Sequence, residues 1–191
     1  MHDLQLLNGV TIKESSIPPN LDQFVDWFLG GKCFTVLGLY WGFDARKIDD
    51  TSRDITAFYC PIRLLWLTSL PTGFTNSPSE FQECMVFIFN EEIVKQVMNV
   101  FIDDAPICGP LTTYLDENGN PAVLPERPQI RCYIWEHAID LNQILHRLIE
   151  AGGTFSGKKL QICQLKVTIL GHEVGVEGHK PDAGRVKAIT N

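Results

Sequence analysis

Apolar residues recur at helical spacing in three segments of the chain. In residues 21–29 they follow an i, i+3, i+4 pattern that begins after Asn20 and stops at Gly30, which predicts a short amphipathic helix with an asparagine cap. Residues 79–98 and 136–151 carry longer patterns and predict two further helices. The buried positions predicted for these helices are Phe81, Met85, Ile88, Val94 and Met98 in the first, and Ile144, Leu145, Leu148 and Ile149 in the second.

Short β-rich runs between these helices predict the strands. Residues 34–39 form one run, and residues 56–60 and 64–67 form a pair that is expected to be a hairpin around Pro61. Residues 161–176 are expected to supply a final hairpin. Because the helices and strands do not alternate regularly, the order of elements favours an α+β layer architecture.

Two adjacent carboxylates, Asp103 and Asp104, stand between two apolar runs. Residues 97–102 and 105–108 read as buried strands, so the pair is predicted to occupy the tight turn of a β-hairpin. Like charges beside an apolar core repel each other, so at least one should have a raised pKa or the pair should hold a cation. A hard divalent cation such as Mg²⁺ would neutralise both. The alternative is that the pair caps a solvated turn, where aspartate is common.

Residues 110–135 follow neither a helical nor a strand period. The segment is rich in proline and contains the turn sequence Asn118-Gly119. This composition predicts a surface loop with one tight turn.

Size and composition bound the class of protein. With 191 residues and 45% hydrophobic content, the chain can bury a full core and is expected to form one domain, residues 1–191. It has no long apolar run and no basic-then-apolar leader, so an intracellular protein, cytoplasmic or nuclear, is expected, with no membrane partner. The six cysteines lie far apart and predict free thiols. A zinc site of Cys132, His137 and His146 is conceivable, although it lacks ligand-pair spacing.

The charge distribution is uneven. The net charge of −7 argues against indiscriminate nucleic-acid binding, which depends on neutralising phosphates with lysine and arginine. Acidic residues dominate residues 1–110, whereas basic residues outnumber acidic ones in residues 158–191. The basic segment is either a stripe that tracks a nucleic-acid backbone or an ordinary solvated face.

Ordered blocks along the chain resemble one protein family. Residues 6–13 (LLNGVTIK), 70–82 (LPTGFTNSPSEFQ), 101–104 (FIDD) and 170–172 (LGH) are similar, in order and spacing, to motifs of the reverse transcriptases of gypsy-type LTR retrotransposons, with variants typical of a fungal-like branch. The resemblance is weak at about 110–135, which we therefore predict to be an insertion. It implies the palm of a right-hand polymerase with partial fingers and no thumb. It also implies two-metal nucleotidyl transfer with Mg²⁺ on an RNA or DNA template–primer and dNTP.

The resemblance further implies roles for single residues. Asp103 would be a direct metal ligand, and Asp104 a nearby catalytic carboxylate. Phe43 and Gln82 match positions that border the incoming nucleotide, although a core aromatic and a polar helix residue are equally good interpretations. The positions implied to bind nucleic acid are Lys159, Gly171 and His172.

The block at residues 34–43 departs from the family pattern. The family has an aspartate there that is its first metal-binding carboxylate, and this chain has Gly38, which cannot ligate a metal through a side chain. Nothing in the sequence aims Asp44 at the same ion. In addition, Gln5 stands where the family usually has arginine.

Three functions are compatible with these features. The first is a working RNA-directed DNA polymerase that tolerates Gly38. The second, which the missing carboxylate favours, is a truncated and catalytically impaired copy of such a domain. The alternative is a host-recruited nucleic-acid- or protein-interaction module without polymerase activity. If the site descends from a polymerase, the Asp103–Asp104 turn should lie beside Gly38, on the concave face of one antiparallel sheet that also carries residues 167–174.

Overall fold

A computed structural model describes residues 3–14, 19–39, 46–182 and 184 of the chain. Phe43 and Asp44, which were considered as site residues, lie outside this described part. The helices are α1 (Gln5–Val10), α2 (Leu21–Asp26), the 3-10 helix η1 (Asp50–Thr56), α4 (Ser77–Ile88), α5 (Asn90–Val94) and α6 (Cys132–Glu150). The strands are β1 (Phe34–Gly38), β2 (Phe58–Tyr59), β3 (Leu64–Leu65), β4 (Asp104–Cys108), β5 (Val123–Leu124), β6 (Arg127–Arg131), β7 (Gln161–Gln164), β8 (Lys166–Ile169), β9 (His172–Gly175) and β10 (Gly178–Pro181).

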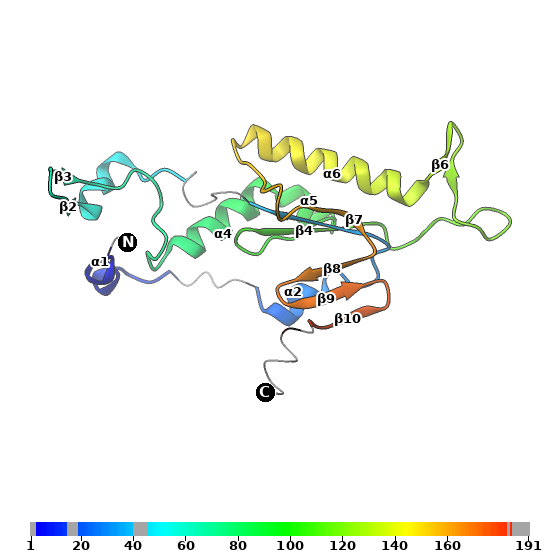
Figure 1. The fold of residues 1–191 in the computed structure, drawn as a ribbon, viewed down its shortest axis with the longest axis horizontal. Helices are drawn as coiled ribbons and strands as arrows, with labels where there is room; N and C mark the ends of the chain where they lie inside the picture. The colour runs from blue at the N-terminus through cyan, green and yellow to red at the C-terminus, as the bar shows by residue number, and fades with distance from the viewer. Residues whose placement is uncertain (1–2, 15–18, 40–45, 183, 185–191) are drawn as a thin grey trace.

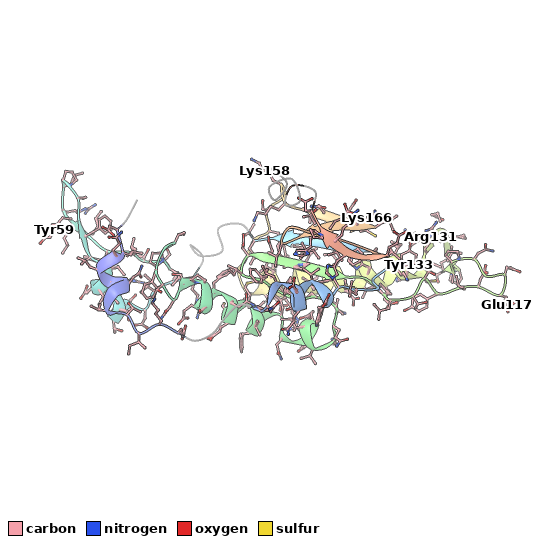
Figure 2. The ribbon with its side chains drawn as sticks, turned by 90° about the horizontal axis from the view of Figure 1, so that it is seen from below. Tyr59, Glu117, Arg131, Tyr133, Lys158 and Lys166 are labelled. Carbon is pink, nitrogen blue, oxygen red and sulfur yellow. The ribbon has the colours of Figure 1, made fainter. Side chains whose placement is uncertain are left out.

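The molecule is elongated, with its sheets in the middle (Figure 1). Helix α1 and the β2–β3 hairpin lie at one end, and the loop and hairpin around β5 and β6 project from the other. Tyr59 and Glu117 mark these two ends in Figure 2. The predicted hairpin around Pro61 is confirmed, because β2 and β3 pair antiparallel.

The helices follow the predicted pattern with local corrections. The Asn20 side chain accepts hydrogen bonds from the first N–H groups of α2, so the predicted cap is confirmed. The prediction of a single helix over 79–98 is wrong: the helix breaks at Phe89 and ends at Val94, a residue that is 73% exposed. Helix α6 begins at Cys132 rather than at residue 136, and Ile149 was wrongly placed inside, since it is 69% exposed. Ile149 directly follows the buried Leu148, so its side chain is rotated by about 100° around the helix axis and faces solvent.

The strands form two main sheets rather than the one sheet predicted. One has the order β4-β1-β7 and the other the order β10-β9-β8, with antiparallel pairing in both. The hairpin predicted for residues 161–176 is confirmed for β8 and β9 only, because residues 161–164 form the separate strand β7. Residues 167–174 belong to the second sheet. The reason is the short break at Leu165, after which the chain leaves the edge of β1 and pairs with itself.

Each face of the β4-β1-β7 sheet packs against its own core. On one face, Leu37 and Ile107 contact α4 and α6 through a cluster that includes Phe81, Met85 and Ile144. The other face packs against α2 and the second sheet. This second cluster comprises Phe24, Val25, Phe28, Phe34, Cys108, Val167, Ile169 and Val174. Strand β1 is therefore buried on both sides, as its uninterrupted apolar sequence indicates.

Residues 110–135 are more ordered than the predicted loop. They contain the β5–β6 hairpin and the first turn of α6, which were not predicted because proline breaks the strand pattern. A turn near Asn118-Gly119 is confirmed, since Gly119 has φ 79° and its N–H donates to Asp116 O. Whether the segment is an insertion stays a prediction.

All six cysteines are free thiols, with Cys33 and Cys108 buried. No helix in the described part of the chain is both long and apolar enough to span a membrane.

Candidate active site

Strands β1 and β4 bring Gly38 opposite Asp104. Their register pairs Phe34 with Cys108 at one end and Gly38 with Asp104 at the other. Because side chains alternate across a strand, Gly38 and Asp104 lie on the sheet face that carries Phe34 and Cys108, away from α4 and α6. The predicted proximity of the aspartates to Gly38 is therefore confirmed.

Ile102 and Asp103 form the tight turn that leads into β4. Phe101 and Asp104 exchange backbone hydrogen bonds of 2.9 and 3.0 Å across it, and Ile102 adopts φ 54°. A left-handed backbone is unfavourable for a β-branched residue, so the turn needs support from its surroundings. Leu39 N donates to Asp103 O at 2.8 Å and ties the turn to the end of β1. The prediction that both aspartates occupy the turn is corrected: Asp104 is the first residue of β4.

Gln82 of α4 provides the main support for this turn. Its side-chain Nε2 donates to Val100 O at 2.9 Å, and its Oε1 accepts from Ile102 N at 2.6 Å. The residue is buried, so both ends of its amide are used inside the protein. The predicted contact of Gln82 with a nucleotide remains a prediction; in this structure Gln82 positions the Asp103 turn.

Lys159 reaches both aspartates from a neighbouring loop. Ser156 N donates to Gly38 O at 2.7 Å, which holds this loop beside β1, and Lys159 N then donates to Ser156 O at 3.1 Å. The Lys159 ammonium lies 2.9 Å from Asp103 Oδ2 and 3.7 Å from Asp104 Oδ1. Lys159 was predicted to face nucleic acid, and here its charge faces the two carboxylates.

The electrostatics of this group follow from its partial burial. Burial, followed by the neighbouring charge of Asp103, raises the pKa of Asp104, and Lys159 opposes that rise. The expectation that one aspartate has a raised pKa is thus confirmed. The hydrogen bond to Asp103 raises the pKa of Lys159, so the lysine stays charged at neutral pH. The three side chains are 34–52% exposed, so solvent screens these interactions.

The side chains that the structure describes do not fit a two-metal centre. Gly38 offers no ligand, and the carboxylates of Asp103 and Asp104 already hold an ammonium. Within the described residues, no group of three His, Cys, Asp or Glu side chains is placed to hold a metal ion. The conceivable zinc site is likewise unsupported, because the buried His137 is used in the core, with Nε2 2.7 Å from Thr35 Oγ1.

The predicted primer-gripping hairpin forms between β8 and β9. Leu170 and Gly171 make its turn with φ of 48° and 79°, which explains a glycine at the second position. His172 is largely buried, and its ring centroid lies 5.8 Å from that of His179 on β10. The nucleic-acid contacts assigned to Gly171 and His172 remain predictions, and His172 turns inward rather than toward solvent.

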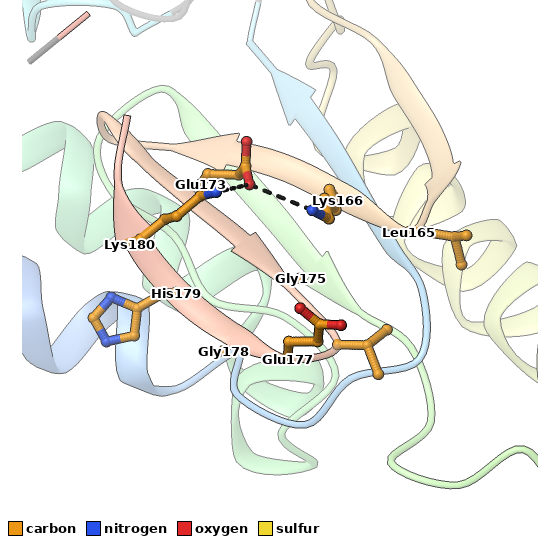
Figure 3. Close-up of a pocket in the computed structure, with 9 residues that line it drawn as sticks. Leu165, Lys166, Glu173, Gly175, Glu177, Gly178, His179 and Lys180 are labelled. Carbon is orange, nitrogen blue, oxygen red and sulfur yellow. Dashed lines mark ion pairs between the residues drawn. The ribbon is translucent and has the colours of Figure 1, made fainter. Parts of the chain in front are cut away.

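A pocket of about 370 Å³ lies along β8, β9 and β10 (Figure 3). Glu173 bridges Lys166 and Lys180 there, at 3.6 and 3.2 Å, and its pKa is lowered mainly by the Lys180 hydrogen bond. The basic segment predicted from the sequence is therefore partly neutralised where it folds into a sheet.

Sequence reasoning missed two features of this site. The ion pairs of Lys159 depend on the conformation of a loop whose sequence has no recognisable pattern, so they could not be predicted from the sequence. The support of the Ile102 turn by Gln82 was also missed, although a polar residue on the buried side of a helix is a signal for such a bond.

The chain is similar to reverse transcriptases in both sequence and structure. A family model described as reverse transcriptase (RNA-dependent DNA polymerase) matches residues 8–174. The chain is 27% identical to the retrovirus-related Pol polyprotein from transposon 297 of Drosophila melanogaster over 191 residues, 99% of this chain and 16% of that polyprotein. It is 26% identical to the Pol polyprotein from transposon gypsy of the same organism, over 98% of this chain and 16% of that one. It is 26% identical to the enzymatic polyprotein of cauliflower mosaic virus (strain D/H), over 92% of this chain and 22% of that polyprotein.

Solved structures show the same fold. The foamy viral protease-reverse transcriptase in complex with double-stranded DNA matches with a TM-score of 0.78 at 23% identity, over 99% of this chain and 29% of that one. The same viral protein in complex with an RNA/DNA hybrid matches with a TM-score of 0.76, at 23% identity, over 99% of this chain and 22% of that one. The α+β architecture is therefore that of a reverse transcriptase. The chain spans about a fifth of the length of the curated relatives that it matches.

Proposed function

The chain belongs to the reverse transcriptase (RNA-dependent DNA polymerase) family, and from this membership we propose that it is a catalytically impaired reverse-transcriptase domain of a gypsy-type retrotransposon polyprotein. The proposed partners are a template–primer duplex of RNA or DNA and a dNTP. Support comes from the gypsy-type relatives and from structural neighbours that were solved with double-stranded DNA and with an RNA/DNA hybrid.

One observation carries the proposed impairment. Gly38 stands opposite Asp104, where the resemblance expects a metal-binding aspartate, and Lys159 is paired with the two remaining carboxylates. Reverse transcriptases generally use divalent metal ions, which supply charge stabilisation in phosphoryl transfer and lower the pKa of the attacking hydroxyl. Mg²⁺ is accordingly proposed to bind this chain weakly or not at all.

Primer extension on an RNA template, in Mg²⁺ and separately in Mn²⁺, tests the proposal. If the lost carboxylate reduces transition-state stabilisation by about 4 kcal/mol, the rate falls roughly a thousandfold. We therefore expect the native chain to give no more product than its Asp103→Asn variant. The Gly38→Asp variant should extend the primer faster than the native chain, because it restores the third carboxylate. Efficient synthesis by the native chain that disappears in Asp103→Asn would contradict the proposal.

A second candidate function is a protein-interaction module without polymerase activity. It is favoured by apolar side chains on the segment that projects beyond β4, where Leu111 and Leu115 are 68% and 64% exposed. Fluorescence anisotropy with a labelled RNA/DNA duplex at several salt concentrations separates the candidates. The proposed reverse-transcriptase domain binds the duplex with a negative salt slope, whereas a pure protein-interaction module does not bind it.

A further inference from the structure

Lys159 occupies the space that a side chain at position 38 would need. A Cβ built on Gly38 would lie 3.0 Å from Lys159 Cβ and closer still to Lys159 Cδ. Contacts this short would force the lysine stem to shift, so the stem lies in its present position across β1 because residue 38 is glycine. The stem in turn sets the direction of the ammonium, which emerges beside the Asp103 turn.

The ammonium also supplies positive charge to the two carboxylates. It is a compact cation that donates to Asp103 at 2.9 Å and lies 3.7 Å from Asp104, so it screens the repulsion between the two carboxylates. No other cationic side chain is paired with either aspartate in the described part of the chain. A divalent ion that entered this site would have to displace the ammonium or remain beside it.

We propose that Lys159 is a built-in cation that replaces the metal ion at the Asp103–Asp104 pair, and that Gly38 is the residue that admits it. Gly38 and Lys159 thus act as one compensating pair: the glycine removes a metal ligand and also opens the path for the substitute cation. Two features then oppose the binding of a divalent ion: the site lacks a carboxylate at position 38, and the Lys159 ammonium repels the ion. This inference deepens the proposed function, on which it rests for the nature of the site, but it concerns ion binding rather than synthesis.

Two substitutions in different elements should unblock the site. Lys159→Met keeps an unbranched stem and removes the charge. Repulsion between an ammonium and a divalent ion at contact distance corresponds to roughly a tenfold or larger change in affinity even in a water-like dielectric. Gly38→Ala adds no ligand atom, yet its methyl group would force the lysine stem to shift and so weaken the hold of the ammonium on the aspartates. Lys159→Met should therefore bind Mn²⁺ at least about tenfold more tightly than the native chain. Gly38→Ala, which keeps the charge but displaces it, should show a smaller gain in the same direction.

Mn²⁺ binding, measured by the electron paramagnetic resonance signal of the free ion at constant ionic strength, tests this inference. Lys158→Met is the matched control, because Lys158 is the adjacent lysine, is exposed, and projects outward at the edge of the molecule in Figure 2. It should bind Mn²⁺ like the native chain. Adding Asp103→Asn to Lys159→Met should abolish the gain, which assigns the ion to this site.

The inference is overturned if the native chain and Lys159→Met bind Mn²⁺ equally, or if Gly38→Ala gives no gain while its fold, checked by circular dichroism, is intact. Lys159→Gln serves as a second charge-removing variant if the methionine variant does not fold. Because the readout is ion binding, its failure is distinct from that of the proposed function, which fails if the native chain synthesises DNA efficiently or does not bind the duplex.

Discussion

Replacing Gln82 with leucine tests whether this residue holds the Asp103 turn in place. Leucine has a similar size but makes neither hydrogen bond, so Val100 O and Ile102 N lose their side-chain partner. A buried backbone group without a partner costs about 1–3 kcal/mol, and Ile102 N is only partly buried, so we expect a loss of roughly 2–4 kcal/mol in the free energy of unfolding. For a chain of this length, such a loss lowers the melting temperature by roughly 5–12 °C.

Urea unfolding followed by circular dichroism gives the free energy directly. The matched control is Gln143→Leu, which makes the same change on the exposed side of α6 and should stay within about 0.5 kcal/mol of the native chain. If Gln82→Leu is as stable as this control, the residue does not support the turn. A residue that only contacts a nucleotide would also leave the stability of the free protein unchanged, so the experiment separates the two roles.

Two further predictions concern charge. Asp104→Asn should leave the melting temperature at pH 7 unchanged or slightly raised, because burial and Asp103 raise the Asp104 pKa and make its ionised form unfavourable in the folded protein. The gain in the free energy of unfolding should be below about 1 kcal/mol after solvent screening. Asp103→Asn loses the shorter Lys159 bond, so a melting temperature of Asp104→Asn below that of Asp103→Asn would contradict this prediction. Burial lowers the pKa of His137, so the unfolded chain binds the extra proton first and stability is lost as the pH falls below the unfolded value of about 6.5. His137→Gln should therefore flatten the dependence of melting temperature on pH between about 7.5 and 5, whereas a slope equal to that of the exposed control His146→Gln would refute the assignment.

Local patterns predicted much of this fold because they report local physics. The Asn20 cap, the β2–β3 hairpin and the β8–β9 hairpin follow from residues within a few positions of one another. The position of Gly38 beside the aspartates was also predictable, from the order of motifs and the need for a shared site. The division into two sheets was not, since it depends on where the chain bends at Leu165.

The pairing of Lys159 with the aspartates could not be predicted either, because it also depends on contacts between distant parts of the chain. Lys159 was recognised as a basic position, but its partner depends on the loop that Ser156 fastens to Gly38. A lysine and an aspartate separated by 56 residues carry no mutual signal in a single sequence. The loss of a carboxylate at position 38 was visible, whereas the lysine that fills the resulting space was visible only in three dimensions.

The most direct test of the central claim is a crystal structure of the native chain soaked in Mn²⁺, with anomalous scattering used to locate the ion. The account predicts no manganese between Asp103 and Asp104, and the Lys159 ammonium in hydrogen-bonding contact with Asp103. An anomalous peak between the two carboxylates, with Lys159 turned away from them, would contradict it.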